Sequence, residues 1–278
     1  MTHFYPDPFL HSIRSNMTED VTPTPIIITS IDQLLGDIVE NWTPRLHPLA
    51  NPQYHILQGQ YCRLELLNSK TNNKTIQQLY DAFKPTEKTH FTYLSYGPFK
   101  TIDEFKEFIS LKELSSSDTI LYSILVNDTA VGFIALASVN PEYGTIEIGH
   151  VNFSVQLLRT RSATEANYLL LHYAFDILGY RRVEWSCNAL NAKSRRAALR
   201  LGFQYEGTWI KSDLSKGRSR DKSWFSIVDD EWVQLKQEFQ RWLNPENFDN
   251  NGQQLIKLNA AQINPRSNKK KRITSSRI

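Results

Sequence analysis

The chain between residues 59 and 243 alternates between the apolar periodicities of helices and of strands. Apolar residues at steps of three and four predict helices at 75–83, 102–114, 163–178, 192–201 and 231–243. Alternating apolar and polar residues predict strands at 61–67, 119–126, 130–139, 145–153, 182–187, 203–209 and 222–228. Consecutive strands that later alternate with helices indicate an α/β domain, with a mixed, mostly antiparallel sheet flanked by helices on both faces.

The two ends of the chain lack this pattern. Residues 1–58 contain seven prolines and are expected to form an irregular arm, with one short helix at 31–39. Residues 244–278 are rich in Asn, Gln, Ser and Lys, and this composition predicts a disordered tail. The folded domain is therefore predicted to span residues 59–243.

Composition excludes several classes of protein. With 40% hydrophobic and 12% aromatic residues, the chain can bury a core and is not disordered throughout. No apolar stretch approaches the roughly 18 residues that a membrane-spanning helix needs, and no signal peptide is expected. The two cysteines, Cys62 and Cys187, are too few for a disulfide framework or a metal cage. These features predict a cytoplasmic protein without a structural metal.

The formal net charge of +3 is unevenly distributed. Residues 262–278 carry six basic and no acidic side chains, so the rest of the chain has a net charge of 3 − 6 = −3. The body therefore gives no electrostatic reason to expect nucleic-acid binding, except through the tail. The run Lys269–Arg272 is either a nuclear import signal or a solvated basic tail.

One helix start has the features of an anion site. A polar loop leads into the helix predicted to begin near residue 163, and Ser162 with Glu165 matches a capping box. Unpaired amides at a helix N-terminus, together with the helix dipole, bind phosphate groups. Arg159 and Arg161 add positive charge there, and the hydroxyls of Ser162 and Thr164 are further candidate donors.

Several segments resemble the GNAT acetyltransferases, and within them the RimJ/RimL-like branch, which acetylates protein N-terminal amines or small amines. The segments are TIEIGHV (145–151), RSATEA (161–166) and NALNAKSRRAALRLGF (188–203), with WTPRLHP (42–48), LSYGPF (94–99) and KGRSRDKSWFSIVDDEW (216–232) in support. The resemblance implies the acyl-CoA N-acyltransferase fold, acetyl-CoA as the cofactor, and a primary amine as the acceptor. It also implies direct acetyl transfer without a covalent enzyme intermediate.

By position, the pyrophosphate loop of the family falls on Leu158, Arg159, Thr160, Arg161, Ser162 and Ala163. Leu158 stands where the family has Gln or Arg, and Arg161 stands where it has a central Gly. Because glycine permits a positive φ and close approach, Arg161 either presents its guanidinium to the phosphates or weakens cofactor binding.

The resemblance further implies that the strand before this loop separates from strand 182–187. Pantetheine would then bond main-chain groups near Val151 and Phe153. Asn191 and Ser194 match residues that face the pantetheine and the acyl sulfur; the alternative is that they only cap the helix.

Glu147 has a spacing from the loop like that of the catalytic glutamate in many GNAT enzymes. As a general base it would take a proton from the amine. The alternative is an outward-facing glutamate paired with solvent or a lysine, and Glu184 is a weaker candidate. The usual tyrosine acid is replaced by Ala198, which leaves Ser194 as the candidate proton donor to the thiolate.

Acceptor binding is expected at the loop that follows the first predicted helix, with the hairpin 212–221 as a second wall. The loop residues are Tyr93, Tyr96, Gly97, Pro98 and Phe99, although Tyr93 and Phe99 could instead pack beneath the loop. His90, His150 and His172 fit no metal-ligand pattern. Because of Arg161 and the absent tyrosine, a non-catalytic acyl-CoA-binding module with the same fold remains the alternative function.

Overall fold

The computed structural model describes residues 39, 42–115, 118–264 and 266. The chain divides into a unit of residues 1–42 and a unit of residues 43–278, and the helices and strands described here belong to the second unit. The basic run Lys269–Arg272 and residues 31–38 of the predicted N-terminal helix lie outside the described residues. Within the described part of the chain, no helix is long and apolar enough to span a bilayer.

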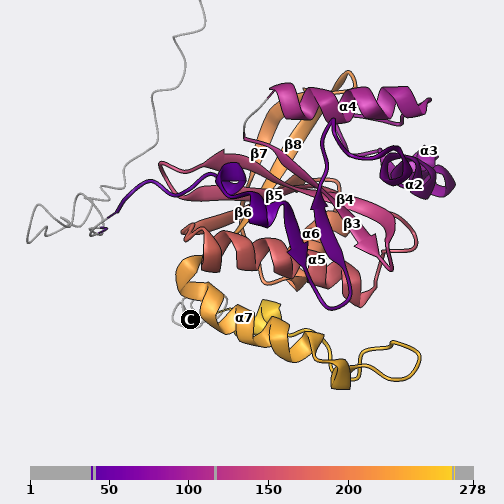
Figure 1. Ribbon diagram of the computed structural model, residues 1–278. Coiled ribbons are helices and arrows are strands. Elements are labelled where there is room, and N and C mark those ends of the chain that lie inside the picture. Colours follow the sequence, from indigo (N-terminus) through magenta and orange to yellow (C-terminus); the bar gives the residue numbers. More distant parts are fainter. Residues whose placement is uncertain (1–38, 40–41, 116–117, 265, 267–278) are drawn as a thin grey trace, which may run out of the picture. The chain divides into compact units, whose positions relative to one another are not determined.

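An eight-stranded sheet forms the centre of this unit, in the order β1-β2-β3-β4-β5-β6-β8-β7 (Figure 1). The strands are β1 (Ile56–Gln58), β2 (Arg63–Leu66), β3 (Ile120–Val126), β4 (Thr129–Asn140), β5 (Thr145–Phe153), β6 (Arg182–Asn188), β7 (Gln204–Ser215) and β8 (Arg218–Val228). All neighbours pair antiparallel except β5 and β6, which pair parallel. The predicted mixed, mostly antiparallel sheet is confirmed, and only the short strand β1 was not anticipated.

Helices cover both faces of the sheet, also as predicted. One face carries α2 (Asn73–Phe83) and α4 (Ile102–Ser115), with α3 (Glu87–His90) between them in the chain. The other carries α5 (Arg161–His172), α6 (Ala192–Arg200) and α7 (Asp229–Leu243), and the short helix α8 (Ala260–Ile263) packs on α7. A single π-helical segment, Tyr173–Ile177, continues α5. Short 3₁₀ turns lie at Pro48–Ala50, Pro52–His55, Lys84–Thr86 and Pro245–Asn247.

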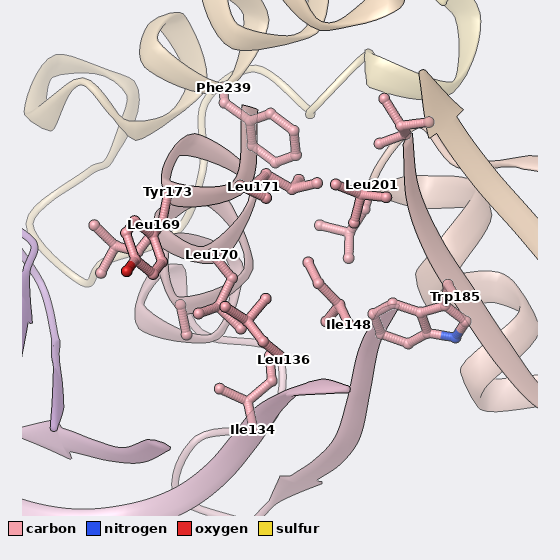
Figure 2. Close-up of a cluster of buried hydrophobic side chains, with 14 of the residues drawn as sticks. Ile134, Leu136, Ile148, Leu169, Leu170, Leu171, Tyr173, Trp185, Leu201 and Phe239 are labelled. Atoms are coloured by element: carbon pink, nitrogen blue, oxygen red, sulfur yellow. The ribbon is translucent and has the colours of Figure 1, made fainter. Parts of the chain in front are cut away.

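The larger core lies between the sheet and α5 (Figure 2). Ile134 and Leu136 of β4 and Ile148 of β5 point toward Leu170 of α5, and all four side chains are at most 1% exposed. Burying one such side chain contributes about 1.5–3 kcal/mol. On the opposite face the alternate residues of β4 meet an aromatic cluster from α2 and α4. The period-two pattern of β4 therefore separates two cores, and functional side chains on β5 must lie on one face or the other.

A two-residue turn joins β3 to β4. Asn127 and Asp128 have φ values of 48° and 58°, and Val126 pairs with Thr129. Positive φ at both central residues of a two-residue loop is the type I′ turn, which matches the twist of antiparallel strands. Asn and Asp tolerate this conformation better than other non-glycine residues.

Residues 43–58, which precede the predicted domain start at residue 59, contact the rest of the unit. The hydroxyl of Tyr173 donates to the carbonyl of Pro48 at 2.6 Å, and the amide of Arg45 donates to the carbonyl of Pro141 at 2.9 Å. Isolated prolines indicate irregular backbone, but backbone carbonyls can still be held by tyrosines that are distant in sequence. The folded unit therefore includes residues 43–58.

Residues 244–264, which fall within the predicted tail, also contact the rest of the unit. Asn247 bonds backbone groups of Trp242 and Ile256, and the fully buried Asn264 donates to the carbonyl of Gly202 at 2.9 Å. Arg266, counted with the basic tail, forms salt bridges to Glu206 and Glu231. Buried amide side chains hold this segment, and a low-hydrophobicity composition does not reveal them.

The ion cluster around Glu206 makes stability depend on pH. Hydrogen bonds from Arg182, then from Ser226 and Arg266, lower the pKa of Glu206 to about 2. Because folding lowers the pKa of Glu206, its ionised carboxylate stabilises the fold fully above the unfolded-state pKa near 4.3. This contribution is lost as the pH falls toward 2.

We expect Glu206→Gln to flatten the dependence of the unfolding free energy on pH between about 4.3 and 2. The loss at pH 7 should be on the order of 1 kcal/mol, because the carboxylate is partly exposed and solvent screens it. Urea denaturation at several pH values measures this, with Glu246→Gln at an exposed position as the control. If the unfolding free energy of Glu206→Gln depended on pH as steeply as that of the wild type, Glu206 would not be the source of this pH dependence.

Candidate active site

Strands β5 and β6 pair over only three residues and then diverge. The parallel register joins Thr145 to Arg182, Ile146 to Val183 and Glu147 to Glu184, and no further pair follows. Strand β5 nevertheless continues to Phe153, pairing with β4 along its other edge. The predicted separation of these strands is confirmed. One backbone edge of β5 beyond Glu147, including Val151 and Phe153, is therefore open to an extended ligand.

A bulge in β5 changes which residues face α2 and α4. Ala135 pairs with Gly149 and Phe133 with Asn152, so β5 has one extra residue in this interval. His150, in the bulge, has a φ of 48°. A bulge reorients the side chains around it. Here it places the side chains of His150 and Asn152 on the same face of β5 as Glu147.

The loop after β5 starts helix α5 differently from the prediction. The side chain of Thr160 accepts a hydrogen bond from the amide of Ala163 at 3.1 Å, so Thr160 is the N-cap and Arg161 the first helical residue. The capping box predicted for Ser162 and Glu165 is wrong.

The left-handed backbone position of this loop is Arg159, with a φ of 64°. Arg161, which stands where the family has its central glycine, is already helical. Replacing glycine at this position therefore causes no backbone strain.

The first turn of α5 leaves backbone donors available. In the described part of the chain, the amides of Arg161 and Ser162 have no hydrogen-bond partner. They belong to a helix of 12 residues, whose dipole favours an anion at this end. The N-terminus of α5 can therefore hold a phosphate through its backbone.

Side chains near this turn mostly bond within the protein. The Ser162 hydroxyl donates to the carbonyl of Tyr61 at 3.0 Å, and Thr164 Oγ1 accepts from Arg200 at 3.1 Å. The Arg161 guanidinium lies over the ring of Tyr61, 4.2 Å from its centroid, and near Phe248. Leu158 and Arg159 are exposed. A contact between Arg161 and phosphate stays a prediction, because its guanidinium packs on aromatic rings in this structure.

Glu165 holds the first turn of α5 against the β1–β2 turn. Its carboxylate accepts hydrogen bonds from the amides of Gln60, Tyr61 and Cys62 at 2.7–2.8 Å, and the side chain is 4% exposed. A Cβ at Gly59 would lie 2.5 Å from the Glu165 carboxylate, so this close approach requires glycine. Sequence analysis missed this anchor, because the partners are about 100 residues apart and are backbone groups.

Glu147 is the last residue of β5 before the strands diverge. Its side chain is 8% exposed and accepts hydrogen bonds from Ser138 of β4 at 3.1 Å and from Ser186 of β6 at 2.5 Å. The alternative of an outward-facing glutamate paired with solvent or lysine is therefore wrong. Glu184, the weaker candidate, is paired with Arg182 at 2.7 Å. Of the two carboxylates, only Glu147 is held by neutral hydroxyls alone.

Asn191 and Ser194 lie at the start of α6. Asn191 accepts from the amide of Ser194 at 3.1 Å, which is the helix-capping role of the alternative interpretation. Ser194 Oγ accepts from the indole of Trp185 at 3.0 Å, and the Ser194 side chain also hydrogen-bonds Cys187. Ala198, at the position of the missing tyrosine, is fully buried.

Burial raises the pKa of the Cys62 and Cys187 thiols. A protonated thiol is a poor nucleophile, so neither cysteine is suited to form an acyl-enzyme.

The predicted acceptor loop divides into packed and polar parts. Phe99 packs on Phe91, Phe105 and Phe108, which is the alternative interpretation for this residue. Gly97, with a φ of 61° and a cis bond to the exposed Pro98, allows the loop to pass close to the Phe91 ring.

Tyr93 is half-buried, whereas the Tyr96 hydroxyl hydrogen-bonds Asn152 and His150 of β5. Lys216, at the tip of the β7–β8 hairpin, donates to the carbonyl of Phe91 at 2.8 Å. The structure therefore brings Tyr96 and the hairpin together beside β5, and their role in binding the acceptor stays a prediction. Sequence analysis missed His150 and Asn152 as their partners, because the bulge that orients them leaves no sequence signal.

The comparisons with known proteins agree with this geometry. A family model described as an acetyltransferase (GNAT) domain matches residues 72–204. The crystal structure of a GCN5-related N-acetyltransferase from Brucella melitensis is 40% identical, with a TM-score of 0.73, covering 79% of this chain and 97% of that one. The chain belongs to the GNAT acetyltransferase family.

Two further relatives are similar to this GNAT acetyltransferase. A probable GNAT-family acetyltransferase from Chromobacterium violaceum is 38% identical with a TM-score of 0.65, covering 76% of this chain and 100% of that one. The N-acetyltransferase p20 of Bacillus licheniformis is 27% identical over 145 residues, or 51% of this chain and 81% of p20. Acetyl transfer to an amine acceptor, with acetyl-CoA as donor, is the activity of this family.

We expect Glu165→Gln to lower the unfolding free energy by about 2–3 kcal/mol, since a buried charged acceptor of three amides is lost. Urea denaturation measures the change, with Glu107→Gln on the exposed face of α4 as the control. A change below about 0.5 kcal/mol, the usual range for surface substitutions, would show that the anchor does not contribute.

Proposed function

We propose that this GNAT acetyltransferase transfers the acetyl group of acetyl-CoA directly to the primary amine of a protein N-terminus or small molecule. The observation that carries the proposal is the divergence of β5 and β6 after Glu147. It leaves an open strand edge that leads to the unpartnered amides of α5. The sequence segments quoted above support placement in the RimJ/RimL-like branch.

The residues present fit the cofactor. The amides of Arg161 and Ser162 would hold the diphosphate, and backbone groups near Val151 and Phe153 would bond the pantetheine arm. Asn191 and Ser194 lie at the helix that starts after β6. When bound, acetyl-CoA supplies the activated thioester; the protein's contribution is to position it and to manage protons.

Glu147 is the proposed general base. A primary amine is largely protonated at neutral pH and must lose a proton before it can attack. The hydroxyls of Ser138 and Ser186 hold the Glu147 carboxylate in one orientation at the point where the strands separate. Ser194, whose side chain hydrogen-bonds Trp185 and Cys187, is the proposed donor to the leaving thiolate.

We expect Glu147→Gln to lower kcat/KM for the amine by about 10²–10⁴-fold, the usual contribution of a general base. Affinity for CoA should stay within about twofold of the wild type, because the Glu147 carboxylate lies on the side of β5 that is proposed to bind the acceptor amine. CoA release with a panel of amines and N-terminal peptides measures the rate, and calorimetry measures the affinity.

Glu184→Gln is the matched control, since Glu184 is the register partner of Glu147 on β6. Wild-type rates for Glu147→Gln between pH 6 and 9 would remove it from the mechanism. CoA binding by the wild type without CoA release from any acceptor would favour the non-catalytic module.

Two substitutions at Arg161 separate backbone from side-chain binding of the diphosphate. Proline suits the first position of a helix, and Thr160, with φ of −96° and ψ of 163°, already has the conformation that precedes proline. Arg161→Pro removes the amide hydrogen, whereas Arg161→Ala removes only the guanidinium.

We expect Arg161→Pro to bind CoA about 10-fold or more weakly than Arg161→Ala, since a hydrogen bond to a charged group contributes about 1.5–3 kcal/mol. Calorimetry with CoA measures both. Equal affinities would exclude this amide from the phosphate site. If the wild type itself shows neither heat nor a thermal shift with saturating CoA, the cofactor assignment fails.

A further inference from the structure

We propose that His150 is a specificity-determining residue of the acceptor site: its Nε2–H donates a hydrogen bond to an oxygen atom close to the acceptor amine. The inference rests on the proposed function. It adds a residue outside the cofactor site and the Glu147 base, and it selects among the amines that the proposed function leaves open.

The position of His150 follows from the bulge in β5. His150 and Glu147 share the face of β5 that α2 and α4 cover, and only Gly149 on that face lies between them. A Cβ on Gly149 would lie 3.8 Å from the Glu147 carboxylate, so the absence of a side chain at Gly149 leaves the space beside this carboxylate open. Three strand residues span about 10 Å, which lets one small acceptor reach both Glu147 and His150.

A chain of hydrogen bonds determines which imidazole nitrogen carries the proton. Asn152 Nδ2 donates to the Tyr96 hydroxyl at 2.7 Å and to the carbonyl of His150 at 2.9 Å, while its Oδ1 lies 2.9 Å from His90 Nε2. Tyr96 accepts from Asn152, and among the described residues the acceptor available to its own proton is His150 Nδ1, 3.1 Å away, so donation to this nitrogen satisfies every group of the chain. His150 Nδ1 is therefore an acceptor, and Nε2 carries the hydrogen.

The imidazole is neutral and its second nitrogen is available. Burial, with a smaller contribution from Lys112 of α4, lowers the pKa of His150 to about 4. Burial also raises the pKa of Tyr96, which keeps its hydroxyl protonated. Among the described residues, no group bonds His150 Nε2, and the ring is only partly buried.

A neutral donor at a fixed position discriminates between acceptors. An amine with a carbonyl or hydroxyl oxygen nearby satisfies Nε2–H, whereas an alkylamine leaves the donor unpaired. A diamine would bring a second ammonium group toward this donor and toward Lys112, which disfavours it further. The site therefore suits an aminoacyl or amino-alcohol group better than a polyamine.

Two substitutions test the donor while keeping the fold. Asn tolerates the positive φ of His150 and can still accept from Tyr96, but it does not reach the Nε2 position. Gln reaches farther and can restore a donor there. The acceptors are alaninamide and propan-2-amine, which differ by the carboxamide group. Ratios of variant to wild type cancel the difference in pKa between the two amines.

We expect His150→Asn to lower kcat/KM for alaninamide at least 10-fold more than for propan-2-amine, mainly through KM, with partial recovery in His150→Gln. In the wild type, ¹⁵N spectra at pH 7 should show a protonated Nε2 and an unprotonated Nδ1. Equal losses for both amines, or a protonated Nδ1, would overturn the role proposed for His150. Neither result would affect the proposed function. If the wild type binds CoA but releases none with either amine, the proposed function fails and this role fails with it.

Discussion

The short parallel pairing of β5 with β6 is the constraint on which the rest of the site depends. Three residue pairs hold the strands together, and the strands separate after Glu147 and Glu184. Each strand is secured on its other side, β5 by β4 and β6 by β8. The sheet can therefore leave backbone hydrogen-bonding groups unpaired in its middle without losing its continuity.

Backbone groups, more than side chains, define the proposed cofactor site. The hydroxyls of Ser162 and Thr164 and the guanidinium of Arg161 are bonded to or packed on the protein itself. What remains at the start of α5 is a pair of amides, held in place by the bonds of Glu165 to the β1–β2 turn. This arrangement explains why a loop without its usual glycine and first polar residue still fits the family.

On the proposed acceptor side, hydroxyl and amide groups orient the side chains that would contact the amine. Glu147 is oriented by two serines from neighbouring strands, and His150 by a tyrosine and an asparagine. Glu147 is buried, so water competes only weakly at its carboxylate, whereas His150 is partly buried. The bulge at His150 brings the two onto one face, so a local irregularity of one strand joins the proposed base to the proposed specificity residue.

Sequence alone determined the mixed sheet and the helices on both faces, which follow from periodicity over a few residues. Local motifs carried the resemblance to the family, and that resemblance implied the separation of β5 from β6. Only the tertiary structure decided that Thr160 caps α5, that Glu165 anchors it, and that residues 43–58 and 244–264 belong to the folded unit. It also decided that His150 faces Tyr96. The Thr160 cap is a local choice between neighbouring hydroxyl residues, and the others depend on a hydrogen bond between distant segments or on a one-residue shift of register. None of these changes the pattern of apolar and polar residues along the chain.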